Sequence, residues 1–199
     1  MSSTNLAGFQ PIASGHKLDS NEFGFLTEST DHINDPAFLR QRMREDGYLY
    51  LKNFYDRDAV LAARKVVTDR LLEDEILDPR FLSTDGVLND VRVVNRRSAF
   101  SPKADDGREM KTYAPEELTR GNKPLWDLLN SRRVMDFFHS FFDIPAHRFH
   151  YIWFRAVGRG NGTPPHCDWV YMSRGTPNLY TTWVPLGDTP LNVGGLMIL

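Results

Sequence analysis

Residues 163–169 read Thr-Pro-Pro-His-Cys-Asp-Trp, and further aromatic and apolar residues follow them. The prolines fix φ just ahead of His166. If 166–171 form a β-strand, alternation places His166 and Asp168 on one face and Cys167 on the other. Both side chains can then bind one metal ion, and a second histidine from another strand would complete the 2-His-1-carboxylate triad typical of non-haem Fe(II) oxygenases. Because short motifs also occur by chance, the alternative is a surface histidine beside a solvated aspartate.

The hydrophobic pattern divides the chain into a helical part and a β-rich part. From about residue 148 onward the period is 2, which favours strands. Aromatic and β-branched residues predict strands at 151–155 and 179–186. Shorter strands are predicted at 48–51 and 91–94, and a polar loop at 101–108.

Helix signals precede the β-rich part. Asn34-Asp35-Pro36 combines a capping side chain with a proline in the first turn, which predicts a helix that Gly47 ends. Asp56 is a predicted cap of a second helix that ends near 77–79. A third helical stretch is predicted over 115–142, with a second segment beginning at Ser131.

Composition excludes several classes of protein. The chain has 199 residues, 41% of them hydrophobic, and a formal net charge of −2. Its length suits one domain, and its near-neutral charge gives no reason to expect nucleic acid or a membrane as a partner. The lone cysteine, Cys167, excludes an intrachain disulfide, and no apolar run approaches the ~20 residues that span a bilayer. No secretory leader is recognisable, so the expected location is cytoplasmic.

Three motifs in the last third resemble the metal-binding half of the phytanoyl-CoA dioxygenase (PhyH-like) family of Fe(II)- and 2-oxoglutarate-dependent oxygenases. They are Pro-His-Cys-Asp at 165–168, Thr-Thr-Trp-Val-Pro-Leu at 181–186 and Val-Gly-Gly-Leu-Met-Ile-Leu at 193–199. Upstream, Asp-Gly-Tyr-Leu-Tyr-Leu at 46–51, followed by a helix, is similar to the opening of the family's domain. The resemblance spans about residues 40–199 and is strongest after 150.

The resemblance implies an α+β fold in which N-terminal helices pack on a double-stranded β-helix (jelly-roll, cupin-like) core. Residues 1–33 are expected to be a mobile N-terminal arm, and 34–199 a single dioxygenase domain. His166 and Asp168 would be Fe(II) ligands, and Trp183 would lie beside the co-substrate 2-oxoglutarate. The alternative for Trp183 is simple packing in the core. The other partner that the resemblance implies is a small-molecule substrate.

The same resemblance makes two absences informative. The family pattern requires a distal histidine as third ligand and then an arginine that pairs the far carboxylate of 2-oxoglutarate, and no histidine follows His166. His150 is the least implausible substitute, although it lies outside the family's third-ligand position. About half of the eight strands of a jelly roll are recognisable. The sequence is therefore interpreted as a C-terminally truncated member whose core and metal site are incomplete.

Two function classes follow from this interpretation, with a third that is weaker. The first is a non-haem Fe(II)- and 2-oxoglutarate-dependent dioxygenase (hydroxylase) whose activity is impaired in a 199-residue chain. The second is a non-catalytic remnant or interaction module of the same fold, which would self-associate through the open sheet edge near 196–199. The third is a zinc hydrolase, which would need more histidine or cysteine ligands than this region contains.

Overall fold

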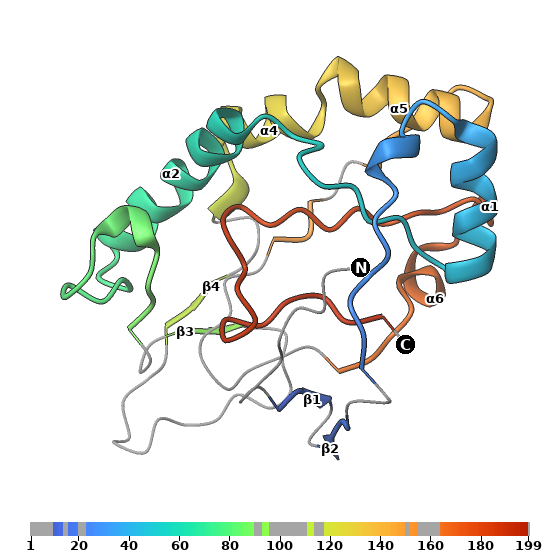
Figure 1. Ribbon diagram of the computed structural model, residues 1–199. Helices are drawn as coiled ribbons and strands as arrows, with labels where there is room; N and C mark the ends of the chain where they lie inside the picture. Colours follow the sequence, from blue (N-terminus) through green and yellow to red (C-terminus); the bar gives the residue numbers. More distant parts are fainter. Residues whose placement is uncertain are drawn as a thin grey trace. The chain divides into compact units, whose positions relative to one another are not determined.

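The computed structural model describes residues 10–13, 16–19, 23–89, 93–95, 111–113, 118–149, 152–154 and 164–198. The chain divides into two compact units. One unit is formed by 27–161, and the other joins 1–26 to 162–199. The first contains the long helices labelled in Figure 1, and the second contains His166 and Asp168. Each unit is described by itself below.

The first long helix confirms the predicted start and stop signals. Helix α1, Pro36–Asp46, has Asp35 at its N-cap, where Oδ1 accepts a hydrogen bond of 3.0 Å from the Phe38 N–H. The proline occupies the first turn, where the missing N–H costs nothing because that position has no partner within the helix. Gly47 ends the helix with φ of 76°, a left-handed conformation that glycine adopts without a steric penalty.

The second helix begins where predicted but ends earlier. Helix α2, Arg57–Glu73, is capped by Asp56, and the predicted end near 77–79 is wrong by at least three residues. Glu75 turns the chain with φ of 56°, and Leu77 then pairs with Leu88 in an antiparallel bridge. The apolar pattern does continue past α2, but in extended backbone, because a short apolar run suits either conformation. None of the described helices is long and apolar enough to cross a membrane.

The third helical stretch contains the predicted break. Helix α4, Lys123–Leu129, is followed by helix α5, Arg132–Phe142, with Ser131 at the N-cap as predicted. Helix α5 packs aromatic rings along its length: Phe137 lies edge-on to Phe54 with 5.3 Å between ring centroids. Such pairs add to the hydrophobic burial of the rings.

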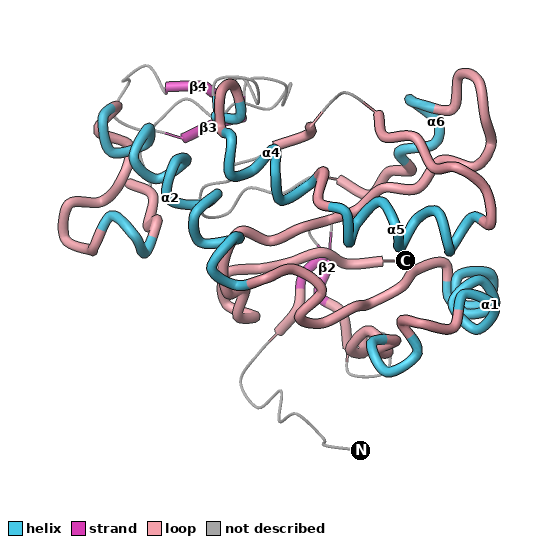
Figure 2. The backbone as a smooth tube through the Cα atoms, turned by 90° about the horizontal axis from the view of Figure 1, so that it is seen from above, coloured by secondary structure: helices cyan, strands magenta, loops and turns pink. Residues whose placement is uncertain are grey.

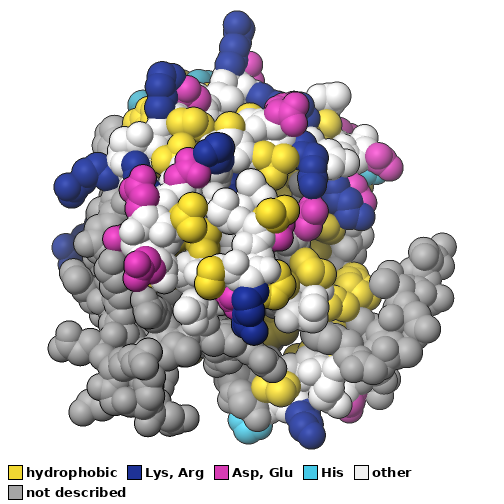
Figure 3. Space-filling model, turned by 90° about the vertical axis from the view of Figure 1, so that its left-hand side faces the viewer, with side chains coloured by type: hydrophobic (Ala, Val, Ile, Leu, Met, Phe, Trp, Pro, Cys, Tyr) yellow, Lys and Arg dark blue, Asp and Glu magenta, His cyan; other side chains and the backbone are white. Residues whose placement is uncertain are grey.

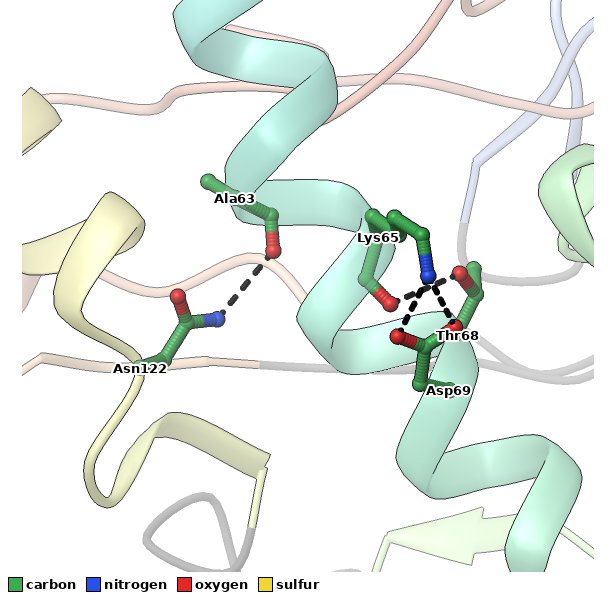
Figure 4. Close-up of polar contacts among 5 residues, drawn as sticks. All are labelled: Ala63, Lys65, Thr68, Asp69 and Asn122. Atoms are coloured by element: carbon green, nitrogen blue, oxygen red, sulfur yellow. Dashed lines mark hydrogen bonds and ion pairs between the residues drawn. The ribbon is translucent and has the colours of Figure 1, made fainter.

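Helices α2 and α4 share the core of this unit and lie side by side in Figures 1 and 2. Asn122, 2% exposed, joins them, because its Nδ2 donates to the Ala63 carbonyl at 3.1 Å (Figure 4). Its Oδ1 accepts from the Leu125 N–H at 3.0 Å. One side chain therefore caps α4 and fixes its N-terminus against α2. The apolar residues buried in this region are Ala63, Val67, Leu71, Ile76, Leu118, Leu125 and Leu128.

Arginines from the helices bind backbone carbonyls of neighbouring segments. Arg70 of α2 donates to the Leu118 carbonyl at 2.8 Å. Arg40 of α1 donates to the carbonyls of Ser140 and Phe141 at 3.2 and 3.0 Å, at the end of α5. The last carbonyls of a helix lack partners within it and carry partial negative charge, so a guanidinium suits this position. These contacts order the packing of α1 on α5.

The outer side of α2 is charged. Lys65 forms an ion pair with Asp69, with Nζ 2.9 and 2.7 Å from the two carboxylate oxygens, and the Thr68 hydroxyl donates to the Lys65 carbonyl (Figure 4). Figure 3 faces the side of Figure 1 on which α2 and the 3-10 helix η2, Ser83–Asp85, lie, and shows basic and acidic side chains interspersed around apolar ones. This mixture agrees with the near-neutral net charge.

Strands are short in the described residues. Strands β1, Ile12–Ala13, and β2, His16–Lys17, are antiparallel, whereas β3, Val93–Asn95, and β4, Lys111–Tyr113, are parallel. The predicted strand at 48–51 is reduced to one parallel bridge between Tyr50 and Glu28. Glu28 stands just before the 3-10 helix η1, Thr30–His32. The strand predicted at 91–94 overlaps β3, and its first two residues lie outside the described residues. The loop predicted at 101–108 also lies outside the described residues.

The β-rich part has little regular structure where it is described. Residues 152–154 and 179–186 carry no strand, so the strand predictions there do not hold for the described residues. The physical reason is that an extended segment becomes a strand only when its N–H and C=O groups bond to a neighbour. Residues 168–172 form a helix, as shown below. A double-stranded β-helix core stays a prediction.

The buried Asn122 yields the first test. Asn122→Ala removes both the cap of α4 and the bond to the Ala63 carbonyl, so we expect the free energy of unfolding to fall by about 2 kcal/mol. Asn130→Ala is the control, because that amide bonds only within its own helix, to the Trp126 carbonyl at 2.6 Å. It should change stability by about 0.5 kcal/mol or less. Urea unfolding followed by circular dichroism measures both, and equal effects would contradict the bridging role of Asn122.

A second test uses Asp78, whose carboxylate oxygens lie 2.9 and 3.1 Å from Arg80 Nε. The hydrogen bonds from Arg80 lower the pKa of Asp78 from 3.8 to about 2. Because the folded-state pKa is depressed, the contribution to stability is complete above about pH 4 and is lost as the pH falls through 2. Arg80→Gln should raise the pKa of Asp78 toward 3.8 in an NMR titration and destabilise the chain at pH 6 but not at pH 1.5. A pKa that stays near 2 would contradict the assignment.

Candidate metal site

The segment that carries His166 and Asp168 is a turn into a short helix. Helix α6, Asp168–Met172, has Cys167 at its N-cap in extended conformation. The prediction of a strand over 166–171 is therefore wrong. An acidic residue is favoured in the first turn of a helix, which explains why Asp168 begins one here. His166 and Asp168 still lie together, because the extended backbone at Cys167 places the side chains before and after it on one face.

His166 has a defined orientation. Its Nδ1 lies 2.8 Å from the Pro164 carbonyl oxygen. A carbonyl oxygen only accepts hydrogen bonds, so Nδ1 must carry a proton and donate it. In the neutral ring, Nε2 then bears a lone pair and no hydrogen. This is the arrangement that metal-binding histidines adopt, with the second ring nitrogen fixed by a backbone carbonyl.

The lone pair of His166 faces a carboxylate. Nε2 of His166 lies 3.2 Å from Oδ1 of Asp168. A lone pair and an anionic oxygen repel each other at this distance, so a positive group belongs between them. That group is either a proton on Nε2 or a metal ion bound by both atoms.

The separation of the two atoms suits a shared ion. Adjacent donors bound at about 2.1 Å lie about 3.0 Å apart on an octahedral ion and about 3.4 Å apart on a tetrahedral one. The observed distance of 3.2 Å lies between these values. A small adjustment therefore brings Nε2 and Oδ1 onto one ion of either geometry.

Thr181 completes the surroundings of the carboxylate. Its Oγ1 donates to Oδ2 of Asp168 at 2.8 Å, across 13 residues of sequence. Thr181 is a residue for which the sequence alone predicts no role. One signal could have identified it, because residues two apart in an extended segment share a face, and Thr181 stands two residues before Trp183.

The pair is partly shielded from solvent. The side chains of His166 and Asp168 are 32% and 24% exposed. Tyr171 of α6 lies edge-on to the His166 ring, with 6.3 Å between ring centroids. Cys167, between the two donors, is an exposed free thiol. Trp183 is 50% exposed, and its role stays a prediction.

The described residues supply two metal donors at this place. They contain no group of three His, Cys, Asp or Glu side chains arranged to hold a metal ion. His150, the substitute considered for the third ligand, lies outside the described residues. His166 Nε2 and Asp168 Oδ1 fit a divalent cation in donor type, tautomer and spacing. Together they would occupy two of its coordination positions.

The orientation of His166 can be tested without any metal. In a chain labelled with ¹⁵N-histidine, we expect Nδ1 of the neutral His166 ring to show the chemical shift of a protonated nitrogen, and Nε2 that of an unprotonated one. The reason is the Nδ1–H bond to the Pro164 carbonyl. His166→Ala assigns the signals. The opposite tautomer would contradict the geometry on which the candidate site depends.

Comparisons with known proteins place the chain in a family. The chain matches no curated protein and no solved structure. The protein-family model of phytanoyl-CoA dioxygenase (PhyH) matches residues 43–199, which include α1 in part, α2, α4, α5 and the whole His166–Asp168 site. The chain belongs to the phytanoyl-CoA dioxygenase (PhyH) family.

Proposed function

We propose that this protein is a non-haem Fe(II)- and 2-oxoglutarate-dependent dioxygenase that hydroxylates a small molecule, on a double-stranded β-helix core. Members of the PhyH family are generally oxygenases. The single observation that carries the proposal is the opposition of His166 Nε2 and Asp168 Oδ1 at 3.2 Å, with Nδ1 committed to the Pro164 carbonyl.

In this proposal each residue has a distinct part. His166 and Asp168 would hold Fe(II), which when bound with 2-oxoglutarate supplies the activation of O₂ needed to hydroxylate a C–H bond. Pro164 keeps the His166 ring in the tautomer that can bind. Trp183 would lie against 2-oxoglutarate, and its exposed indole leaves a surface for such a contact. The expected place of action is the cytoplasm.

The two donors set the expected strength of binding. Each further ligand lowers the rate at which a labile divalent ion leaves, so two donors alone should bind metal weakly. The third ligand and the group that pairs the far carboxylate of 2-oxoglutarate are not assigned to any described residue. We therefore expect measurable metal binding by the 199-residue chain and little or no turnover.

The test is a titration of the 199-residue chain with Mn(II), which replaces Fe(II) without oxidising, followed by the EPR signal of the free ion. We expect saturable binding that His166→Ala and Asp168→Ala each abolish, because either change removes half of the donors. Binding should weaken as the pH is lowered, since protons compete with the metal for Nε2.

Cys167→Ser is the matched control, because Cys167 stands between the two donors in sequence. The proposal predicts that it leaves Mn(II) binding unchanged. Loss of binding in Cys167→Ser would instead indicate a thiolate ligand and a zinc-type site. Binding that persists in both alanine variants, or no saturable binding by the wild-type chain, would overturn the proposal.

A second candidate function is a non-catalytic interaction module. The observation that favours it is a set of exposed apolar side chains at 193–198: Val193 is 71% exposed and Leu196, Met197 and Ile198 are 41–48% exposed. This function predicts concentration-dependent self-association without metal binding. Sedimentation velocity over a range of protein concentrations, with and without Mn(II), separates the two candidates.

A further inference from the structure

The two oxygens of the Asp168 carboxylate have different partners. Oδ1 faces His166 Nε2 at 3.2 Å, and Oδ2 accepts the Thr181 hydroxyl at 2.8 Å. The terminal torsion of an aspartate is broad, so partners on its oxygens decide the orientation of the carboxylate plane. The hydroxyl hydrogen bond on Oδ2 therefore fixes the plane of the carboxylate and aims Oδ1 at His166.

Thr181 suits this task chemically. Its hydroxyl must act as the donor, because an ionised carboxylate only accepts. A hydrogen bond to an ionised acceptor is stronger than one between neutral groups. The side chain is branched at Cβ, which restricts χ1 and keeps the hydroxyl in place. The Asp168 side chain is 24% exposed, so it is partly shielded from water.

We propose that Thr181 is a positioning residue of the metal site, which holds the Asp168 carboxylate so that Oδ1 alone is presented to the ion. The proposal rests on the proposed function, because it assumes that His166 and Asp168 bind one metal. Thr181 would affect the ion only by orienting Asp168 and would not bind the ion itself.

A consequence concerns the coordination positions of the ion. With Oδ2 engaged by Thr181, Asp168 occupies one position instead of two. A chelating co-substrate such as 2-oxoglutarate needs two adjacent positions, and a single-oxygen carboxylate leaves more of them open. Thr181 also stands two residues from Trp183, so one segment would orient a metal ligand and carry the residue proposed to contact the co-substrate.

A purely structural role for Thr181 is the competing explanation. The same hydrogen bond ties Thr181 to the first residue of α6, and its loss would loosen this contact. The two roles differ in what they change. A structural tie affects the stability of the fold, whereas a positioning role affects metal affinity even when the fold is intact.

The experiment measures the dissociation constant for Mn(II) in three variants of the 199-residue chain. Thr181→Val keeps the shape of the side chain and removes the hydroxyl, and loss of a partner that orients a ligand typically costs 10–100-fold in metal affinity, so we expect about a 10-fold rise. Thr181→Ser keeps the hydroxyl and should stay within about 2-fold of the wild type. Thr182→Val, at an equally exposed neighbouring threonine, should leave the constant unchanged.

Thermal unfolding of each variant separates folding from positioning. A 10-fold rise in Thr181→Val, rescued in Thr181→Ser at an unchanged unfolding temperature, supports the proposal. Saturable binding that Asp168→Ala abolishes but Thr181→Val leaves intact overturns the role of Thr181 and keeps the proposed function. Equal losses in Thr181→Val and Thr181→Ser also overturn it. Absence of saturable binding in the wild-type chain overturns both.

Discussion

The need of backbone polar groups for partners governs how this chain is built. Helix ends leave N–H and C=O groups without partners within the helix, and burial makes such groups costly. The side chains of Asp35 and Asp56 accept hydrogen bonds from backbone N–H groups in the first turns of α1 and α2. Asn122 does the same for α4 and also donates to a backbone carbonyl of α2. Arg40 and Arg70 bind carbonyls of other segments. Apolar burial then completes the packing that these bonds orient.

The same need shapes the candidate metal site. The Pro164 carbonyl accepts a hydrogen bond from Nδ1 of the His166 ring. A backbone acceptor thereby selects the tautomer of the imidazole, and the tautomer leaves Nε2 with a lone pair toward Asp168. The need for a proton or a metal ion between Nε2 and Oδ1 follows from this one hydrogen bond. On the other side of the site, the hydroxyl of Thr181 donates to Oδ2 of Asp168 and restricts the orientation of the carboxylate.

Local chemistry was predictable from the sequence, and contacts between distant residues were not. The caps at Asp35 and Asp56 and the break at Ser131 were predicted because each depends on a few adjacent residues. The end of α2 was misjudged because apolar residues after Glu73 suit a helix or an extended segment equally. At the metal site the sequence indicated His166 and Asp168 as partners, but through a strand where the chain forms a helix. For Thr181 the sequence offers only its place two residues before Trp183, and its hydrogen bond to Asp168 spans 13 residues.

The position of the free thiol has a practical consequence. Cys167 is the sole cysteine of the chain, and its side chain is exposed. A thiol-reactive fluorophore or spin label would therefore attach at one place, adjacent in sequence to both donors. The protein therefore has a single attachment point for a spectroscopic reporter beside the candidate metal site, without the need to remove other thiols or to introduce a new one.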